Sequence, residues 1–220
     1  MTKAVRPKEY MSHRVHPKGF RIKELSDWLS RGFYGSCPAV LLEEDYKIRE
    51  YLEKKLELAD IEKIEIERFS ANISVIIHTA RPGLIIGRRG ENVTALKSSL
   101  QRLVADDKVL RIEIRPVKNP WSSASLCAQW IAHRLEKRMP FRMVLKQSLS
   151  KIVANKEVEG ARVQVSGRLN GVLMSRTEWL KQGKLRRQSI RSDMDYGFTE
   201  ANCSYGVIGV KVWIYKGEKM

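Results

Sequence analysis

Residues 86–93 read IGRRGENV, a segment in which two glycines stand three positions apart with two arginines between them. Glycine at both ends permits a tight turn and lets the backbone approach a ligand closely, because it has no Cβ. Glu91 follows where the first turn of a helix favours an acidic side chain. The free N–H groups of a helix start attract anions. The candidate phosphate-contacting loop therefore comprises Ile86, Gly87, Arg88, Arg89 and Gly90.

The segments around this loop predict a defined order of helices and strands. Residues 43–58 are expected to be helical, because Ile48, Tyr51, Leu52 and Leu56 share one face. Alternating apolar residues predict strands over 61–69, 72–79 and 109–117. The loop lies between a short helix and a longer amphipathic one, which starts at the loop and has Glu91 in its first turn. This order resembles a type II KH module, whose G-x-x-G loop clamps about four nucleotides of single-stranded nucleic acid.

The second half of the chain predicts another α+β unit. Pro116 and Pro120 flank a short linker over 117–121. Apolar spacing then predicts helices over 122–138 and 141–155, followed by strands over 161–169, 173–179, 190–199 and 207–215. The fold class is α+β, divided into an arm over 1–42 with a helical stretch near 23–29, an RNA-binding domain over 43–117 and a C-terminal domain over 118–220.

The charge of the chain points to an anionic partner. Its 220 residues carry 41 Lys+Arg against 25 Asp+Glu, a net charge of +16, while 43% apolar composition excludes a wholly disordered basic tail. Residues 1–110 hold 20 basic and 16 acidic side chains, and residues 111–220 hold 21 and 9. Nucleic acid is the leading partner, with an anionic membrane surface or an acidic protein as alternatives.

The sequence argues against other classes of protein. There is no apolar run of about 18 residues for a transmembrane helix. Residues 1–10 are polar and charged without an apolar segment, so no secretory signal is expected. Three distant cysteines suit a reducing interior rather than a disulfide framework or zinc site. The Lys-Ser/Thr of a P-loop is missing, which argues against nucleotide binding. His13 and His16 have no evident Cys or acidic ligand nearby, so no metal site is predicted, and neither a cofactor nor a small-molecule substrate is expected. Four tryptophans indicate core or interface anchors, with base stacking by one of them as an alternative: Trp121, Trp130, Trp179 and Trp213.

Basic side chains of the second half form the second candidate RNA-binding set. Arg142 and Lys146 are four residues apart and share a helix face. The full set is Arg134, Lys137, Arg138, Arg142, Lys146, Arg168, Lys184, Arg186 and Arg187. Such side chains suit phosphate contacts, which position RNA without reading its sequence. A solvated surface residue is the alternative for any single member.

Several longer motifs resemble one family across nearly the whole chain. They read VHPKGFR at 15–21, VSGRLNG at 165–171, SRTEW at 175–179, DMDY at 193–196 and YGVIGVKVW at 205–213. Together with the KH loop, they resemble small-subunit ribosomal protein number three of bacterial type. The resemblance implies an N-terminal type II KH domain and a C-terminal α+β domain specific to this family.

The resemblance also implies a function. The expected role is a non-enzymatic structural constituent of the small-subunit head in cytoplasmic ribosomes. Its partners would be 16S-type ribosomal RNA, mRNA and the small-subunit proteins numbered ten and fourteen. It would help form the channel by which mRNA enters and assist mRNA unwinding through Arg142 and Lys146. Met143 stands where many relatives carry a second arginine, so the full unwinding role does not carry over.

Two other functions remain as alternatives. A free-standing KH regulator of mRNA would need repeated KH units or a disordered effector tail, and neither is evident in the sequence. A nuclease acting on damaged nucleic acid would need a catalytic group held in a cleft, for which the sequence offers no distinctive constellation.

Overall fold

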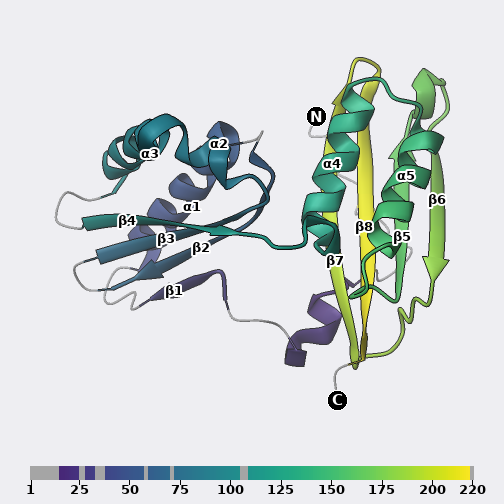
Figure 1. Ribbon diagram of the computed structural model, residues 1–220, viewed down its shortest axis with the longest axis horizontal. Coiled ribbons are helices and arrows are strands. Elements are labelled where there is room, and N and C mark those ends of the chain that lie inside the picture. Colours follow the sequence, from purple (N-terminus) through teal and green to yellow (C-terminus); the bar gives the residue numbers. More distant parts are fainter. Residues whose placement is uncertain are drawn as a thin grey trace, which may run out of the picture.

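The computed structural model describes residues 15–24, 28–32, 38–56, 59–69, 72–104 and 109–218. Two four-stranded sheets organise these residues, and each carries its helices on one face (Figure 1). The last strand of the first sheet, β4 (Val109–Pro116), leads through a short linker with a 3₁₀ turn (Pro120–Ser122) to α4 (Ala124–Glu136), which packs on the second sheet.

The first sheet has the order β1-β2-β3-β4. Its strands are β1 (Ser30–Gly32), β2 (Ile61–Arg68), β3 (Asn72–Thr79) and β4 (Val109–Pro116). β2 and β3 are antiparallel, whereas β1 pairs with β2 and β4 pairs with β3 in parallel. The alternation in the sequence places Ile66 and Val75 fully inside, while Glu65 takes part in ion pairs on the opposite face.

Three helices cover the inner face of the first sheet: α1 (Pro38–Lys55), α2 (Pro82–Ile86) and α3 (Glu91–Gln101). Their apolar stripes bury Leu52, Ile85 and Leu100 completely against the strands. Burial of such a side chain stabilises the fold by about 1.5–3 kcal/mol. The predicted order of helices and strands is therefore present.

The region before residue 43 differs from its prediction. A 3₁₀ helix spans Gly19–Glu24, earlier than the helical stretch expected over 23–29, and residues 25–27 of that stretch lie outside the described part of the chain. β1 was not predicted, because its three residues are too few to show a period. α1 begins at Pro38 rather than at residue 43, since proline is tolerated in the first turn of a helix.

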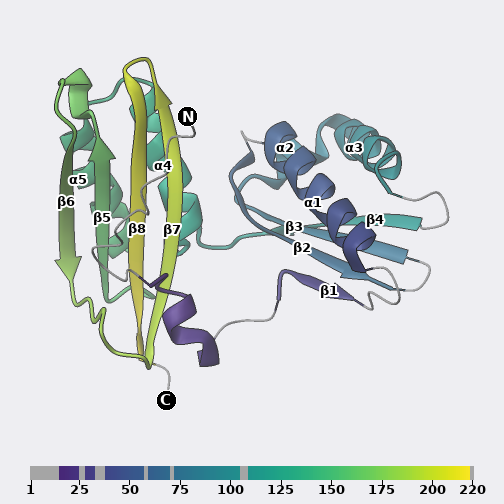
Figure 2. The same ribbon diagram turned by 180° about the vertical axis from the view of Figure 1, so that it is seen from behind.

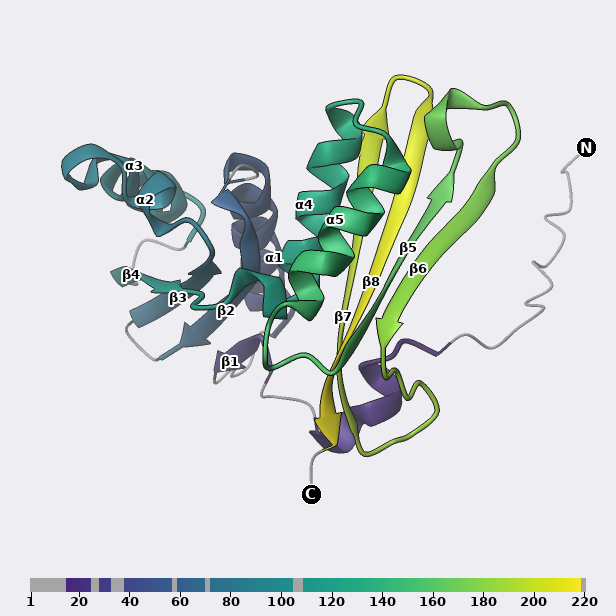
Figure 3. The ribbon, with the colours of Figure 1, turned by 45° about the vertical axis from the view of Figure 1, so that its right-hand side comes forward.

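The second sheet is antiparallel throughout and has the order β6-β5-β8-β7. Its strands are β5 (Gly160–Gly167), β6 (Arg176–Gly183), β7 (Ser192–Cys203) and β8 (Gly206–Glu218). The helices α4 (Ala124–Glu136) and α5 (Phe141–Val153) pack on one face (Figure 3). Ile131, Ile152, Val163 and Val212 are fully buried between helices and sheet.

The strand predicted over 173–179 is displaced. β6 starts at Arg176, and the apolar residues that suggested a strand lie in the preceding loop, where Leu173 is 88% exposed and Met174 is 79% exposed. Positive φ angles at Asn170 and Gly171 turn the chain there, so the apolar run faces outward instead of joining the sheet.

The N-terminal segment packs on the other face of the second sheet, away from α4 and α5 (Figure 2). The Arg21 Nε donates to Ser192 Oγ at 2.9 Å, and Arg21 Nη2 donates to the Arg187 carbonyl at 2.8 Å. Lys18 Nζ lies 3.0 Å from Asp195 Oδ1. Residues that precede the first sheet therefore help to cover the second.

Candidate nucleic-acid interface

The G-x-x-G loop has backbone angles that explain its glycines. Gly87 has φ 70° and ψ −174°, and Gly90 has φ 81° and ψ 9°. Arg89 between them is also left-handed, with φ 52°. A Cβ at Gly87 would lie 2.6 Å from Asn92 Cγ, so a side chain there would force Asn92 to move, whereas no atom lies within 4 Å of a Cβ at Gly90. Only glycine enters the Gly87 conformation without strain.

Hydrogen bonds hold the loop between α2 and α3. The Gly87 N–H donates to the Gly83 carbonyl at 3.0 Å, and Asn92 Nδ2 donates to the Leu84 carbonyl at 3.2 Å. The Thr94 hydroxyl donates to the Gly90 carbonyl at 3.1 Å. The turn is therefore fixed before any ligand binds, which reduces the entropy lost on binding.

The two arginines of the loop are available to an anion. Arg88 and Arg89 are exposed and lie immediately before α3, whose N-terminus carries the positive end of the helix dipole. Ile86 is 42% exposed beside them and offers apolar surface to a base. All five residues predicted for the loop thus lie together, with the chemistry required for a phosphate and an unstacked base.

Part of the predicted basic set gathers near the turn between α4 and α5. Lys137 and Arg138 lie in this turn, and Arg142 and Lys146 are exposed one helical turn apart on α5. Arg142 Nε lies 3.6 Å from Glu178 Oε2 on β6. Arg142 is 72% exposed as a side chain, so this pair is weak and leaves the guanidinium accessible.

Two predicted residues are held by local contacts. Arg168 Nε donates to the Val172 carbonyl at 3.1 Å, and its Nη1 donates to the Tyr205 carbonyl at 3.0 Å. Arg134 lies with its guanidinium 5.0 Å from the Trp130 ring centroid. Both guanidinium groups are therefore already engaged in contacts within the C-terminal domain.

The remaining three predicted residues lie beyond the other end of β6. Lys184, Arg186 and Arg187 follow the strand, and Arg186 forms an ion pair with Glu218. Eight strand residues at about 3.3 Å each place them roughly 26 Å from the Arg176 end. The structure thus divides the nine predicted residues between two ends of the second sheet.

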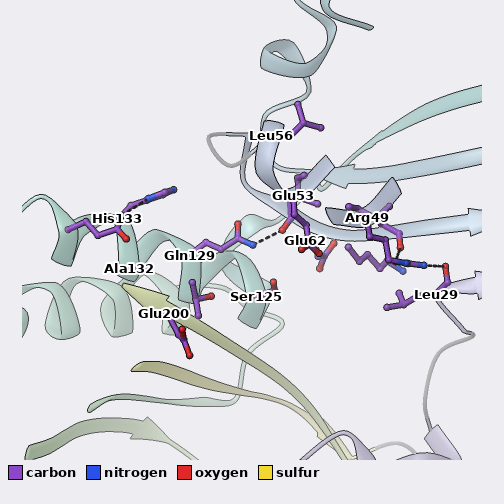
Figure 4. Close-up of a pocket in the computed structure, with 15 residues that line it drawn as sticks. Leu29, Arg49, Glu53, Leu56, Glu62, Ser125, Gln129, Ala132, His133 and Glu200 are labelled. Atoms are coloured by element: carbon purple, nitrogen blue, oxygen red, sulfur yellow. Dashed lines mark hydrogen bonds and ion pairs between the residues drawn. The ribbon is translucent and has the colours of Figure 1, made fainter. Parts of the chain in front are cut away.

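A pocket of about 370 Å³ separates the two sheets (Figure 4). Gln129 Nε2 of α4 donates to the Ile61 carbonyl of β2 at 2.8 Å, which ties the units together. Glutamates from both units line the pocket, namely Glu53, Glu62, Glu136 and Glu200. Their negative charge disfavours RNA here, so the basic surfaces are the better candidates.

The described residues contain no cluster of three side chains suited to a metal ion. In the same parts of the chain, no helix is long and apolar enough to cross a membrane.

Comparisons with known proteins define the class. Residues 47–122 match the family described as KH domain, and residues 131–214 match the family described as Ribosomal protein S3, C-terminal domain. The fold and loop are thus those of a KH-type RNA-binding domain joined to the C-terminal domain of a ribosomal protein.

Relatives extend this match to almost the full chain. The protein is 46% identical over 209 residues to Small ribosomal subunit protein uS3 of Caldicellulosiruptor saccharolyticus, covering 94% of this chain and 93% of the relative. It is 41% identical over 209 residues to the protein of that name from Methylococcus capsulatus, covering 94% and 92%. The chain belongs to the family of small ribosomal subunit protein uS3, whose members are non-enzymatic structural proteins. The predicted family resemblance and α+β fold class are confirmed.

Proposed function

We propose that this protein binds 16S-type ribosomal RNA in the head of the small subunit and lines the channel by which mRNA enters. The observation that carries the proposal is the pair Arg142 and Lys146, exposed one turn apart on α5 with Lys137 and Arg138 at the adjoining turn. These four positively charged side chains at the α4–α5 turn suit contacts with the phosphates of single-stranded mRNA. The small-subunit proteins numbered ten and fourteen are the proposed neighbours.

The two RNA-binding surfaces have different roles in this proposal. The loop Ile86–Gly90 approaches phosphates through its backbone and through Arg88 and Arg89, and it holds ribosomal RNA. The α5 face contacts mRNA and assists its unwinding. Met143 follows Arg142 and is 48% exposed. It adds apolar surface but no charge, so this face binds mRNA more weakly than it would with an arginine at this position. In the proposed division into 1–42, 43–117 and 118–220, the loop lies in the second segment and the α5 face in the third.

Neutralising the α5 pair tests the channel role. Ribosomes carrying Arg142→Gln with Lys146→Gln should pass unstructured mRNA normally and slow selectively at a stable hairpin. For the purified protein, the slope of log affinity against log salt should fall by about 0.7 per lost contact to single-stranded RNA. Lys47→Gln with Lys54→Gln on α1 is the matched control, because it removes the same charge elsewhere. Equal slopes for the two pairs would place Arg142 and Lys146 away from RNA.

Sedimentation tests the proposed location. A native lysate is separated on a density gradient and each fraction is probed for the protein. Stoichiometric presence with the small subunit at moderate salt supports the ribosomal role. Confinement to the light fractions would instead favour a free KH regulator. Cleavage of abasic DNA by the pure protein, lost on a point substitution, would favour the nuclease.

A further inference from the structure

The open face of the second sheet carries two cross-strand rows of aromatic, basic and amide side chains. In the first row, Trp179 of β6 pairs with Gln164 of β5, which pairs with Lys211 of β8, which pairs with Phe198 of β7. The second row holds Lys181, Arg162, Trp213 and Tyr196 in the same strand order. These positions alternate with the buried core valines, so they point away from α4 and α5.

The first row remains accessible while the N-terminal segment covers part of the second. His16 packs edge-on against Tyr196 with 4.9 Å between ring centroids, and Tyr196 lies 5.4 Å from Trp213. Trp179 is 51% exposed and Phe198 is 49% exposed. They stand at opposite edges of the sheet, three strand spacings or about 14 Å apart.

Trp179 is held in a fixed orientation. The Arg162 guanidinium lies 4.3 Å from the Trp179 ring centroid and 5.5 Å from that of Trp213, so it stacks against both indoles. Arg162 Nη2 donates to Gln164 Oε1 at 3.1 Å, which fixes the guanidinium plane. The exposed side of the indole is therefore a preorganised platform for a flat ligand.

The surroundings of the rows are cationic. A groove of about 910 Å³ runs between the N-terminal segment and this face. Among the described residues that line it, Arg21, Arg162, Arg187 and Lys211 are basic and none is acidic. Burial, followed by the charge of Arg187, lowers the pKa of Arg162.

We propose that this sheet face binds a short single-stranded segment of RNA, with one base stacked on Trp179, another on Phe198, and phosphates beside Lys211 and Arg187. A basic groove with exposed aromatic rings is the arrangement that binds single strands with little sequence preference. The site is separate from the G-x-x-G loop and from α5, and it does not depend on the proposed channel role.

The charge pattern argues against the chain's own N-terminus as the occupant. Residues 1–14 carry four basic side chains and one acidic one, so the cationic groove repels them. An acidic peptide shares the required charge, but it offers no flat base for the exposed indole. RNA satisfies both the charge and the aromatic surface.

The test measures binding of fluorescein-labelled decauridine and decaadenosine by anisotropy. The full chain is used with Arg88→Asp, Arg89→Asp, Arg142→Gln and Lys146→Gln, which disable the other two surfaces. In this background Trp179→Ala and Phe198→Ala should each weaken binding about 5- to 150-fold, as loss of one base–aromatic stack does. Trp179→Phe should retain most of the affinity. Tyr46→Ala is the control, because Tyr46 is a 65% exposed aromatic on α1.

The controls separate this proposal from the other functions. Trp179 and Phe198 are half exposed, so circular dichroism should show unchanged folding in their variants. Affinity of Trp179→Ala within twofold of Tyr46→Ala would overturn the proposal. Tight binding of a labelled deca-glutamate, lost in Trp179→Ala while RNA binding persists, would also overturn it and assign the face to an acidic protein. Comparing the wild-type chain with the chain that carries only the four background substitutions tests the proposed function by itself, because none of the four lies on the second sheet. Failure of the proposed function can therefore be told apart from failure of this proposal.

Discussion

Replacing Gly87 by alanine tests the geometry of the KH loop. Its φ of 70° and ψ of −174° lie in a region where a side chain is strained by about 1–3 kcal/mol. The added Cβ would displace the Asn92 side chain, whose bond to the Leu84 carbonyl adds about 0.5–1.5 kcal/mol. The free energy of unfolding should therefore fall by about 2–4 kcal/mol. Gly90→Ala meets no atom and should lose about 1–2 kcal/mol.

The chain offers an internal reference for this measurement. Apart from Trp28, its tryptophans occupy positions 121, 130, 179 and 213, all in the second half. Their fluorescence reports the unfolding of the domain that contains the second sheet, while circular dichroism reports the unfolding of both domains. A loss of 1 kcal/mol lowers the melting temperature of a domain of 60–100 residues by about 4–8 °C. Gly87→Ala should therefore lower the melting temperature of the KH domain, followed by circular dichroism, by about 8 °C or more. The melting temperature of the C-terminal domain, followed by tryptophan fluorescence, should not change.

A double-mutant cycle isolates the contact with Asn92. Asn92→Ala should destabilise the wild-type chain by about 1 kcal/mol, and have little further effect when Gly87 is already alanine, because the hydrogen bond is then lost. Equal losses for Gly87→Ala and Gly90→Ala, or full additivity in the cycle, would refute the reasoning. Because of this strain, any substitution at Gly87 would change folding as well as RNA binding. Arg88→Asp with Arg89→Asp is therefore the better test of RNA binding, because it changes the charge of exposed side chains.

Three further predictions concern individual side chains. Glu178→Gln frees Arg142 from its ion pair, so RNA affinity measured by anisotropy should rise about 2- to 5-fold, the scale of an exposed pair. Burial raises the pKa of Asp195, but the charge of Lys18 and the hydrogen bonds from the Ala124 N–H and from Lys18 together outweigh it, so the net shift is downward. Its stabilisation is therefore present above pH 3.8 and fades below. Urea unfolding should show Asp195→Asn to be about 1.5–3 kcal/mol less stable at pH 7, with the gap closing in acid. Burial raises the pKa of the Cys127 thiol to about 12, so iodoacetamide at pH 8 should modify it only after denaturation, as mass spectrometry would show.

Local periodicity was sufficient to predict most of the fold. Strand β3 follows the predicted range, and α3 begins next to the loop glycines with Glu91 in its first turn. These features depend on neighbours within four residues, which a single sequence displays directly. The G-x-x-G loop was predictable for the same reason, because its glycines encode the backbone angles that the turn requires.

Features that depend on distant residues were not predictable. β1 exists because Ser30 and its two successors pair with the end of β2, a contact across 36 positions. Arg168 looked available to RNA, yet its guanidinium is held by the Tyr205 carbonyl, 37 positions away. Composition identifies a basic side chain, but only the tertiary structure shows whether its hydrogen-bonding capacity is already used.

The two faces of the second sheet divide the positive charge of the second half. Arg142 and Lys146 lie on the helical layer, whereas Lys211 and Arg162 lie on the open face, and the buried core separates the two layers. A strand of RNA that contacts both layers would have to pass around the edge strand β6, where Arg142 lies 3.6 Å from Glu178 and Trp179 is the next residue. The two proposed RNA contacts of this domain therefore lie on opposite sides of it and come together at the β6 edge. The N-terminal segment then limits where RNA can bind on the open face. His16 and Arg21 cover the part near Tyr196 and Arg187, while Trp179 at the β6 edge stays accessible.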